Sequence, residues 1–347
     1  MPLPLTPLRC LERAMTVFAG KTGVVCGEKK FTFEEFGRRC GLLAAALKSL
    51  GIRRGDRVAY LSFNTHKLLE GYYAVPQTGA IVVPLNVRFS AAELSEIGKH
   101  AEPVALFYEQ EFAGLVDQFR AHCKSIRHYV ALDEGTEGGI AYDDLLAAHA
   151  PAPLEISAVN EEDIAELFYT SGSTGTPKGV ALSHRALYFH ALSVATIILD
   201  PQTAVDLATI PLFHANGWGF PQAAPLMGVT QVMVRRFDPV NVMQLIERHR
   251  ATEMSIIPLM GNALLNVPEP GRFDLSSMRQ IQIGGAASSP ALIERMEKLF
   301  QCDVFAGYGL TESGPVLTMA RLKEKRLGRT DEERWKRQAS TGWPIPG

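Results

Sequence analysis

The sequence predicts an α/β fold in which two packed, parallel-rich β-sheets are flanked by helices. Helix and strand signals alternate along both halves of the chain, a pattern typical of parallel sheets covered by helices. A stretch rich in glycine, proline, alanine and acidic residues, 133–160, separates the halves as a surface connection. The length of 347 residues allows a large buried interior. We therefore expect one α/β subdomain over 1–155 and a second over 156–347.

The first half opens with a helix signal of the capping-box type. Thr32 and Glu35 have the spacing at which each side chain bonds the backbone N–H of the other, and Gly51 ends the amphipathic stretch that follows. The elements expected next are a strand at 57–62, a helix at 66–75, a strand at 80–84, a helix capped by Ser90 and Glu93, and a strand at 103–108.

The second half repeats the alternation after the connecting stretch. An apolar strand at 164–169 leads into a loop of glycine, serine and threonine, and a helix is expected from 183 to about 198. The further helix and strand signals lie at 205–213, 240–250, 254–258, 279–283, 290–300 and 303–305. Segment 321–338 is dense in charge and is expected to be a solvated helix or loop.

Composition and charge exclude several classes of protein. Hydrophobic residues make up 46% and charged residues 21%, and the net charge of -2 gives no bulk attraction for nucleic acid. No apolar run is long enough to span a bilayer and the N-terminus does not read as a signal peptide, so we expect a cytoplasmic protein. The five cysteines lack CxxC spacing and indicate neither a disulfide framework nor a zinc site.

The most informative stretch is the loop that follows the strand at 164–169. Segment 169–179 holds three glycines, several hydroxyl side chains and Lys178. Glycines let the backbone approach a ligand closely, while hydroxyls, amide N–H groups and a lysine attract anionic oxygens. The segment is not a Walker A loop, because the required Gly-Lys-Ser/Thr spacing is missing. Its apolar flanks favour phosphate binding over a flexible linker.

The loop resembles the signature phosphate-binding motif of the adenylate-forming superfamily, which includes acyl-CoA synthetases and amino-acid adenylation domains. Four later segments resemble further motifs of that family in the family's order, and two earlier segments fit its N-terminal half. The later segments are 211–214, 284–286, 307–312 and 341–347, and the earlier ones are 32–35 and 55–58. The resemblance covers nearly the whole chain and implies an acyl-CoA synthetase-like large domain.

The resemblance implies an AMP-forming acyl-CoA synthetase that uses ATP, Mg²⁺ and coenzyme A. Such an enzyme converts a carboxylic acid and ATP to an acyl adenylate and pyrophosphate, and then transfers the acyl group to CoA. Thr170 and Glu312 would place the metal, since Mg²⁺ prefers hard oxygen ligands, and His214 would orient the carboxylate. The residues implied in ATP or AMP binding are Thr170, Ser171, Gly172, Ser173, Thr174, Gly175, Lys178, Gly285, Ala286, Ala306, Gly307, Tyr308, Gly309 and Thr311.

The segment 214–221 resembles the fatty acyl-CoA synthetases, in which a tryptophan at the place of Trp218 gates the acyl tunnel. The residues implied in acyl binding are His214, Trp218, Gly284 and Gly285. A medium- or long-chain fatty acid is therefore the expected substrate. An aryl or 4-coumarate-type CoA ligase and an amino-acid adenylation domain are the alternatives, and a non-catalytic adenylate-binding module is the alternative from another class.

The resemblance also carries an expectation about the end of the chain. In the family a ribose-binding aspartate, a hinge, a catalytic lysine and a small C-terminal domain lie further on, so we expect a fragment that performs the complete reaction weakly or not at all. An incomplete small β-barrel near the C-terminal end and a homodimer are compatible with the resemblance. Ala306 departs from the polar residue often found before the Gly-Tyr-Gly segment, which puts one adenine contact in doubt.

Overall fold

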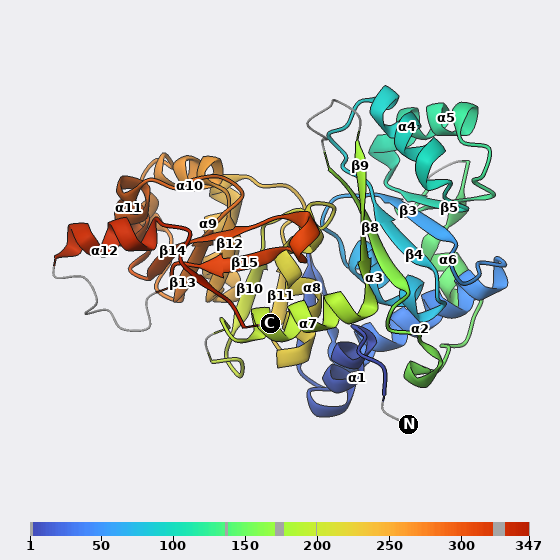
Figure 1. The fold of residues 1–347 in the computed structure, drawn as a ribbon, viewed down its shortest axis with the longest axis horizontal. Helices are drawn as coiled ribbons and strands as arrows, with labels where there is room; N and C mark the ends of the chain where they lie inside the picture. The colour runs from blue at the N-terminus through green and yellow to red at the C-terminus, as the bar shows by residue number, and fades with distance from the viewer. Residues whose placement is uncertain (1–2, 136–137, 171–176, 199, 322–329, 347) are drawn as a thin grey trace.

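Two β-sheets and the helices around them make up the molecule (Figure 1). The computed structural model describes residues 3–135, 138–170, 177–198, 200–321 and 330–346. Within these residues the structure confirms the predicted α/β class with two mostly parallel sheets and flanking helices.

The first sheet has seven strands and is parallel except at one edge, where β8 and β9 form an antiparallel pair. Its strands, in spatial order, are β7 (Ile140–Ala141), β6 (His128–Ala131), β5 (Ala105–Tyr108), β3 (Arg57–Leu61), β4 (Ile81–Pro84), β8 (Ile164–Thr170) and β9 (Lys178–Ser183). The predicted phosphate loop therefore connects two paired strands, and Thr170 lies opposite Lys178 in their register.

The second sheet has nine strands, parallel in its centre and antiparallel at both edges. Its strands, in spatial order, are β16 (Trp343–Pro344), β15 (Val316–Met319), β14 (Asp303–Gly309), β13 (Gln280–Ile283), β12 (Glu253–Ile256), β10 (Val205–Ala208), β11 (Thr230–Met233), β1 (Thr22–Cys26) and β2 (Lys29–Thr32). The antiparallel strands β14 to β16 extend this sheet at its edge, and no closed barrel forms among the described residues.

Strand pairing crosses the expected subdomain boundary at residue 155 in both directions. Strands β1 and β2, from the first 32 residues, complete the nine-stranded sheet, while β8 and β9, which follow residue 155, complete the seven-stranded sheet. The strands from the other half of the chain pair inside each sheet, β8 with β4 and β1 with β11, so both sheets contain strands from both halves.

Helices fill the space between the sheets and cover their outer faces (Figure 1). One apolar cluster joins α2 (Phe33–Ser49), α3 (His66–Gln77) and α6 (Tyr142–Ala147) to strands of both sheets. The outer helices are α4 (Ala91–Ala101) and α5 (Ala113–His122) on the seven-stranded sheet, and α9 (Pro239–His249), α10 (Pro258–Leu265) and α11 (Pro290–Phe300) on the nine-stranded sheet. Both predicted capping boxes, Thr32 with Glu35 and Ser90 with Glu93, are confirmed.

Three further helices lie near the junction of the sheets, and one lies at the C-terminal side. Helix α1 (Leu8–Val17) contacts both α2 and α8 (Phe220–Met227), and α8 packs on α7 (His184–Ala195). Helix α12 (Asp331–Gln338) packs on α11. It forms the C-terminal part of the charged segment 321–338, for which a helix or loop was expected. The short 3-10 turns are η1 (Gln110–Phe112), η2 (Ile156–Ala158), η3 (Ala215–Gly219), η4 (Pro270–Arg272) and η5 (Thr311–Ser313). None of the helices in the described part of the chain has the length and apolar character needed to cross a bilayer.

Candidate active site

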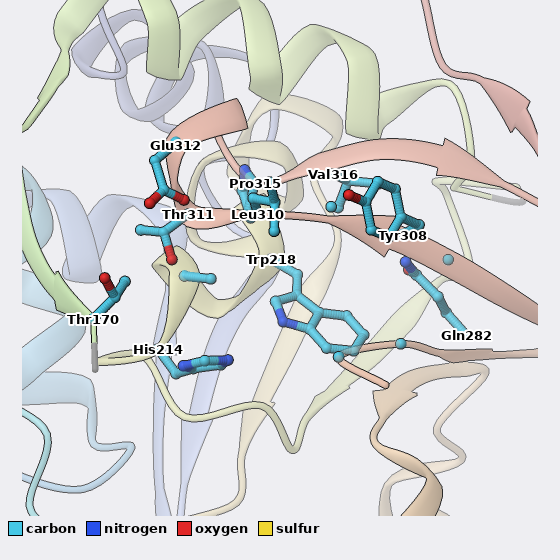
Figure 2. Close-up of a pocket in the computed structure, with 15 residues that line it drawn as sticks. Thr170, His214, Trp218, Gln282, Tyr308, Leu310, Thr311, Glu312, Pro315 and Val316 are labelled. Carbon is cyan, nitrogen blue, oxygen red and sulfur yellow. The ribbon is translucent and has the colours of Figure 1, made fainter. Parts of the chain in front are cut away.

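A cavity of about 320 Å³ lies at the carboxyl ends of the strands, where the two sheets meet. In open α/β sheets, loops at this edge bring residues from distant segments together. The predicted residues that line it are Thr170, His214, Trp218, Gly284, Gly285, Gly307, Tyr308, Gly309, Thr311 and Glu312. Figure 2 shows the labelled side chains around one space, with Thr170 and His214 facing Thr311 and Glu312.

A second cavity of about 370 Å³ adjoins the first and shares five of its lining residues. Two more of the predicted residues, Ala286 and Ala306, line it. The ring of Tyr308 borders both cavities and is 45% exposed, so one of its faces is free to stack on a planar group. The buried Ser288 hydroxyl also lines this cavity and has no hydrogen-bond partner within the described residues.

At three positions around the cavity, close protein neighbours leave no room for a side chain larger than that of glycine. A Cβ on Gly284 would lie 2.9 Å from the indole of Trp218 and 3.0 Å from the carbonyl oxygen of Gly307. A Cβ on Gly307 would clash with the amide nitrogen of Gln282, and one on Gly309 with the carbonyl oxygen of Pro315. Gly284 is therefore required for the tryptophan to occupy the cavity wall, and the two glycines beside Tyr308 allow close strand packing.

Thr170 and Glu312 both supply oxygen atoms to the cavity (Figure 2). Thr170 ends β8, whereas Glu312 lies in the η5 turn that follows β14. The described residues contain no group of three or more histidine, cysteine or acidic side chains that could hold a metal on their own. A hydroxyl and a single carboxylate fit Mg²⁺, which commonly takes one or two protein oxygens and completes its shell with substrate phosphates and water.

His214 stands on the cavity wall between the strand edge and the η3 turn. The residue is exposed to the cavity, but desolvation by the surrounding protein lowers the pKa of its imidazole, and the nearby Arg88 guanidinium lowers it further. The ring is thus neutral near pH 7, where it can donate one hydrogen bond to a carboxylate that needs no deprotonation. The proximity of Arg88 was not foreseen from the sequence.

The backbone of the η3 turn, which carries Trp218, has an unusual conformation. Ala215, Asn216 and Trp218 all have positive φ values, between 46° and 58°, a left-handed conformation that costs roughly 1–2 kcal/mol per residue outside glycine. The buried amide of Asn216 exchanges hydrogen bonds with Gln222, which in turn donates to Glu166 on β8 at 2.8 Å. This buried chain of polar groups stabilises the strained turn and links it to the strand that carries Thr170.

One predicted residue of the described part of the chain is not brought to the cavity. Lys178 lies on β9, is exposed and lines neither cavity. The predicted phosphate-loop residues Ser171, Gly172, Ser173, Thr174 and Gly175 lie outside the described residues.

Five lining residues were missed by the sequence reasoning. They are Ala215, Gln282, Leu310, Pro315 and Val316. Ala215 belongs to the η3 turn, Leu310 and Pro315 belong to the turn after β14, and Val316 begins β15; the geometry of these turns has no signal in the residue types. Gln282 does have a signal in the sequence. Segment 280–283 reads Gln-Ile-Gln-Ile and forms a central strand, so its alternate polar side chains make one face of the strand polar and the other apolar.

Comparison with known proteins yields a match over nearly the whole chain. The family model described as AMP-binding enzyme matches residues 11–347. A long-chain-fatty-acid–CoA ligase of Thermus thermophilus is 36% identical over 344 residues, covering 97% of this chain and 63% of that protein. A peroxisomal butyrate–CoA ligase of Arabidopsis thaliana is 35% identical, covering 91% of this chain and 58% of that protein. The chain thus spans about three fifths of the length of these curated relatives.

Solved structures show the same fold. An anthranilate CoA ligase in complex with anthranoyl-AMP superposes with a TM-score of 0.90 at 25% identity, covering 100% of this chain and 65% of that one. The inhibitor-bound N-terminal domain of FACL13 from Mycobacterium tuberculosis superposes with a TM-score of 0.87 at 27% identity, covering 98% of this chain and 82% of that one.

Proposed function

Because the chain belongs to the family of AMP-binding enzymes, we propose that it carries the adenylate-forming site of an AMP-forming acyl-CoA ligase. The observation that carries this proposal is the convergence of Thr170, His214, Thr311 and Glu312 on one cavity, with Tyr308 at its border with a second. These residues come from three separate motifs, so a chance grouping of lone residues does not account for their convergence.

The first half-reaction requires an electrophilic phosphorus and stabilised phosphate oxygens. A carboxylate oxygen of the acid attacks the α-phosphorus of ATP, the new acyl C–O–P linkage forms, and the bond to the leaving pyrophosphate breaks. The Thr170 and Thr311 hydroxyls donate to phosphate oxygens, and the neutral His214 ring orients the carboxylate for in-line attack. A bound Mg²⁺, held by Thr170 and Glu312, would neutralise charge on the phosphates.

The second half-reaction is acyl transfer to coenzyme A. The thiol sulfur attacks the acyl carbonyl, the thiol proton is released, and AMP leaves. A third cavity of about 740 Å³ lies beside the segment that ends in His214 and is lined by Arg88, Arg235 and Arg236, and also by Glu111, which pairs with Arg235 and Arg236. The net positive charge that these ion pairs leave on the wall, with Arg88 outside them, supports a polyanionic second substrate such as CoA. Because the curated relatives are longer, the complete reaction is proposed for the full gene product.

The identity of the acid is less constrained than the chemistry. The relatives include ligases named for long-chain fatty acids, butyrate, 2-methylpropanoate and benzoate. A medium- or long-chain fatty acid stays the prediction from the sequence, and Trp218 on the cavity wall supports a gate at the acyl entrance. An aryl acid, an amino acid and a non-catalytic adenylate-binding module stay as the alternatives.

ATP–pyrophosphate exchange tests the proposal on the 347-residue chain and on the full gene product, with fatty, aromatic and amino acids as substrates. We expect acid-dependent exchange that Glu312→Gln lowers by roughly a hundredfold or more, since removing one preorganised contact to developing charge costs several kcal/mol. The matched control is Glu332→Gln, an exposed glutamate on α12, which should leave exchange unchanged. Absence of exchange with every acid in the full gene product would leave only the adenylate-binding module.

A further inference from the structure

The nine-stranded sheet has two chemically different faces behind Trp218. The face toward α9, α10 and α11 is apolar and includes Leu207, Met254 and Ile281. The opposite face carries polar side chains on neighbouring strands. Residues in register point to the same face of a sheet. A continuous buried row therefore runs across four strands, formed by Gln231, Asp206, Glu253 and Gln280.

A second polar row lies two residues further along the same strands. Ser255 and Gln282 lie opposite each other there, and the Ser255 hydroxyl donates to the Gln282 side-chain oxygen at 3.4 Å. Both side chains are 5% exposed. Gln282 lines the 320 Å³ cavity beside Trp218 and Val316. The wall that an acyl group would meet past the tryptophan is therefore polar at Gln282.

The space behind this wall is almost closed. Only about 10 Å³ is open there, in a pocket lined by Ser255, Asp206, Gln231 and Phe220. Such a volume holds at most about one water molecule. The 320 Å³ cavity therefore does not continue past Gln282 as an open apolar tunnel.

Several buried polar atoms of the first row have no partner within the described residues. Gln280 donates to Glu253 at 2.6 Å and to the Ile197 carbonyl at 3.1 Å, but its own side-chain oxygen, one oxygen of Glu253 and one of Asp206 accept no hydrogen bond. Burial raises the pKa of Glu253 to about 7 and that of Asp206 well above its usual range. A protonated carboxyl is a donor as well as an acceptor, so the row behind Gln282 and Ser255 is a neutral polar layer.

Given the proposed function, on which this inference rests, we propose that the acid is not the medium- or long-chain fatty acid expected from the sequence but a short one that carries a neutral hydrogen-bonding group, such as a hydroxyl, at its distal end. The two strand residues from Gly284 to Gln282 span about 7 Å, comparable to a four- to six-carbon chain. The distal hydroxyl forms a hydrogen bond with the Gln282 side chain at the cavity wall, and Ser255 holds that side chain from behind. A long alkyl chain would instead cover the Gln282 amide and leave it without a partner, at a loss of roughly tenfold in affinity.

Binding of non-hydrolysable acylsulfamoyl adenosines to the 347-residue chain tests the inference by isothermal titration calorimetry, because it requires no turnover. The probes carry 4-hydroxybutanoyl, butanoyl and dodecanoyl groups, with sulfamoyl adenosine alone as reference. We expect the 4-hydroxybutanoyl probe to bind about tenfold more tightly than the butanoyl probe, and the dodecanoyl probe at least tenfold more weakly than the butanoyl probe.

A variant of similar volume tests whether the polar wall causes the preference. Gln282→Met should remove the advantage of the hydroxylated probe and improve binding of the dodecanoyl probe. Gln244→Met, at an exposed position of α9, is the matched control and should keep the wild-type order. Ser255→Ala provides a second, smaller change if circular dichroism shows that Gln282→Met does not fold.

The outcomes separate the two proposals. If no acylated probe binds better than the reference, the adenylate-forming function itself fails. If the acylated probes bind and the dodecanoyl probe is the tightest, the function stands and the short, polar acid is refuted. If the hydroxylated probe is preferred equally by wild type, Gln282→Met and Ser255→Ala, the polar wall is not the determinant.

Discussion

Gly284 and Trp218 form the contact that shapes the inner end of the cavity. A methyl group on Gly284 would press on the indole ring and on the Gly307 carbonyl. The residue is 6% exposed and its open side faces the cavity, so its position depends on the missing side chain of Gly284.

We expect Gly284→Ala to lower the free energy of unfolding by about 1–3 kcal/mol, as overpacking does. It should also weaken binding of a butanoylsulfamoyl adenosine by tenfold or more, since the tryptophan must move into the cavity. Calorimetry and urea unfolding check both effects. Gly114→Ala is the control, because a Cβ there meets nothing within 4 Å in the exposed helix α5. Equal probe binding by both variants would contradict the role of Gly284.

His190 makes a buried hydrogen bond that depends on its neutral state. Its Nε2 accepts from the Val316 N–H at 2.9 Å, next to the cavity-lining turn. Burial lowers the pKa of His190 to about 4, below the value of roughly 6.5 expected in the unfolded chain. Between these values the unfolded state binds more protons, so this residue contributes stability above pH 6.5 that is lost as the pH falls toward 4.

His190→Gln should weaken the pH dependence of stability. Glutamine can still accept the Val316 hydrogen bond but does not titrate. Between pH 7.5 and 5.0 the wild type should therefore lose about 2 kcal/mol more than the variant, measured by urea unfolding at each pH. The exposed His122→Gln should keep the wild-type dependence. Parallel pH profiles for wild type and His190→Gln would show that His190 is not the titrating group.

At the scale of elements, the segment from β10 to α8 is positioned by the neighbouring sheet. The Asn64 amide, in the loop after β3, donates to the carbonyls of Ala208 and Ile210 and accepts from the Leu212 N–H at 2.7 Å. The Tyr72 hydroxyl of α3 donates to the Leu212 carbonyl at 2.5 Å. These bonds replace the strand pairing that the segment lacks once β10 ends.

Asn64→Leu keeps the side-chain size but leaves the Ile210 carbonyl and the Leu212 N–H without partners, whereas the Ala208 carbonyl keeps a hydrogen bond from the Val234 N–H at 3.3 Å. We expect a loss of about 2 kcal/mol or more in the free energy of unfolding, at roughly 1 kcal/mol or more for each of the two groups. The same change at the exposed Asn266 should stay within about 0.5 kcal/mol. Urea unfolding measures both. A small effect at Asn64 would mean that the segment is held by packing alone.

At the scale of the whole molecule, the two sheets exchange strand pairs. Strands β1 and β2 leave the first half to join the second sheet, and β8 and β9 do the reverse. A cut at residue 155 would therefore expose the edges of β4 and β11, whose partners would be on the other fragment. Unpaired strand edges of this kind promote association.

We expect fragments 1–155 and 156–347 to be unfolded or aggregated when made separately, and to form a folded complex when expressed together. Circular dichroism and size-exclusion chromatography distinguish these states. The intact chain should unfold in urea as one transition when followed by tryptophan fluorescence and by circular dichroism, because the shared core couples both sheets. A fragment that folds alone, with a cooperative transition of its own, would contradict this expectation.

The sequence alone determined the fold class, many of the helices and strands, and the helix caps. Periodicity and cap residues act over a few neighbouring positions, so Thr32 with Glu35 and Ser90 with Glu93 could be read directly. The family motifs also named ten of the residues that line the 320 Å³ cavity. The roles of these residues in ATP, metal and acyl binding stay predictions.

Only the tertiary structure decided which strands share a sheet and what lies behind the cavity. Pairing of β1 with β11 joins segments about two hundred residues apart, and no local pattern encodes such a partner. The polar row of Gln231, Asp206, Glu253 and Gln280 likewise consists of single residues from four strands. Each looks like an isolated polar residue in the sequence, and they become one surface because the register places them on the same face of the sheet.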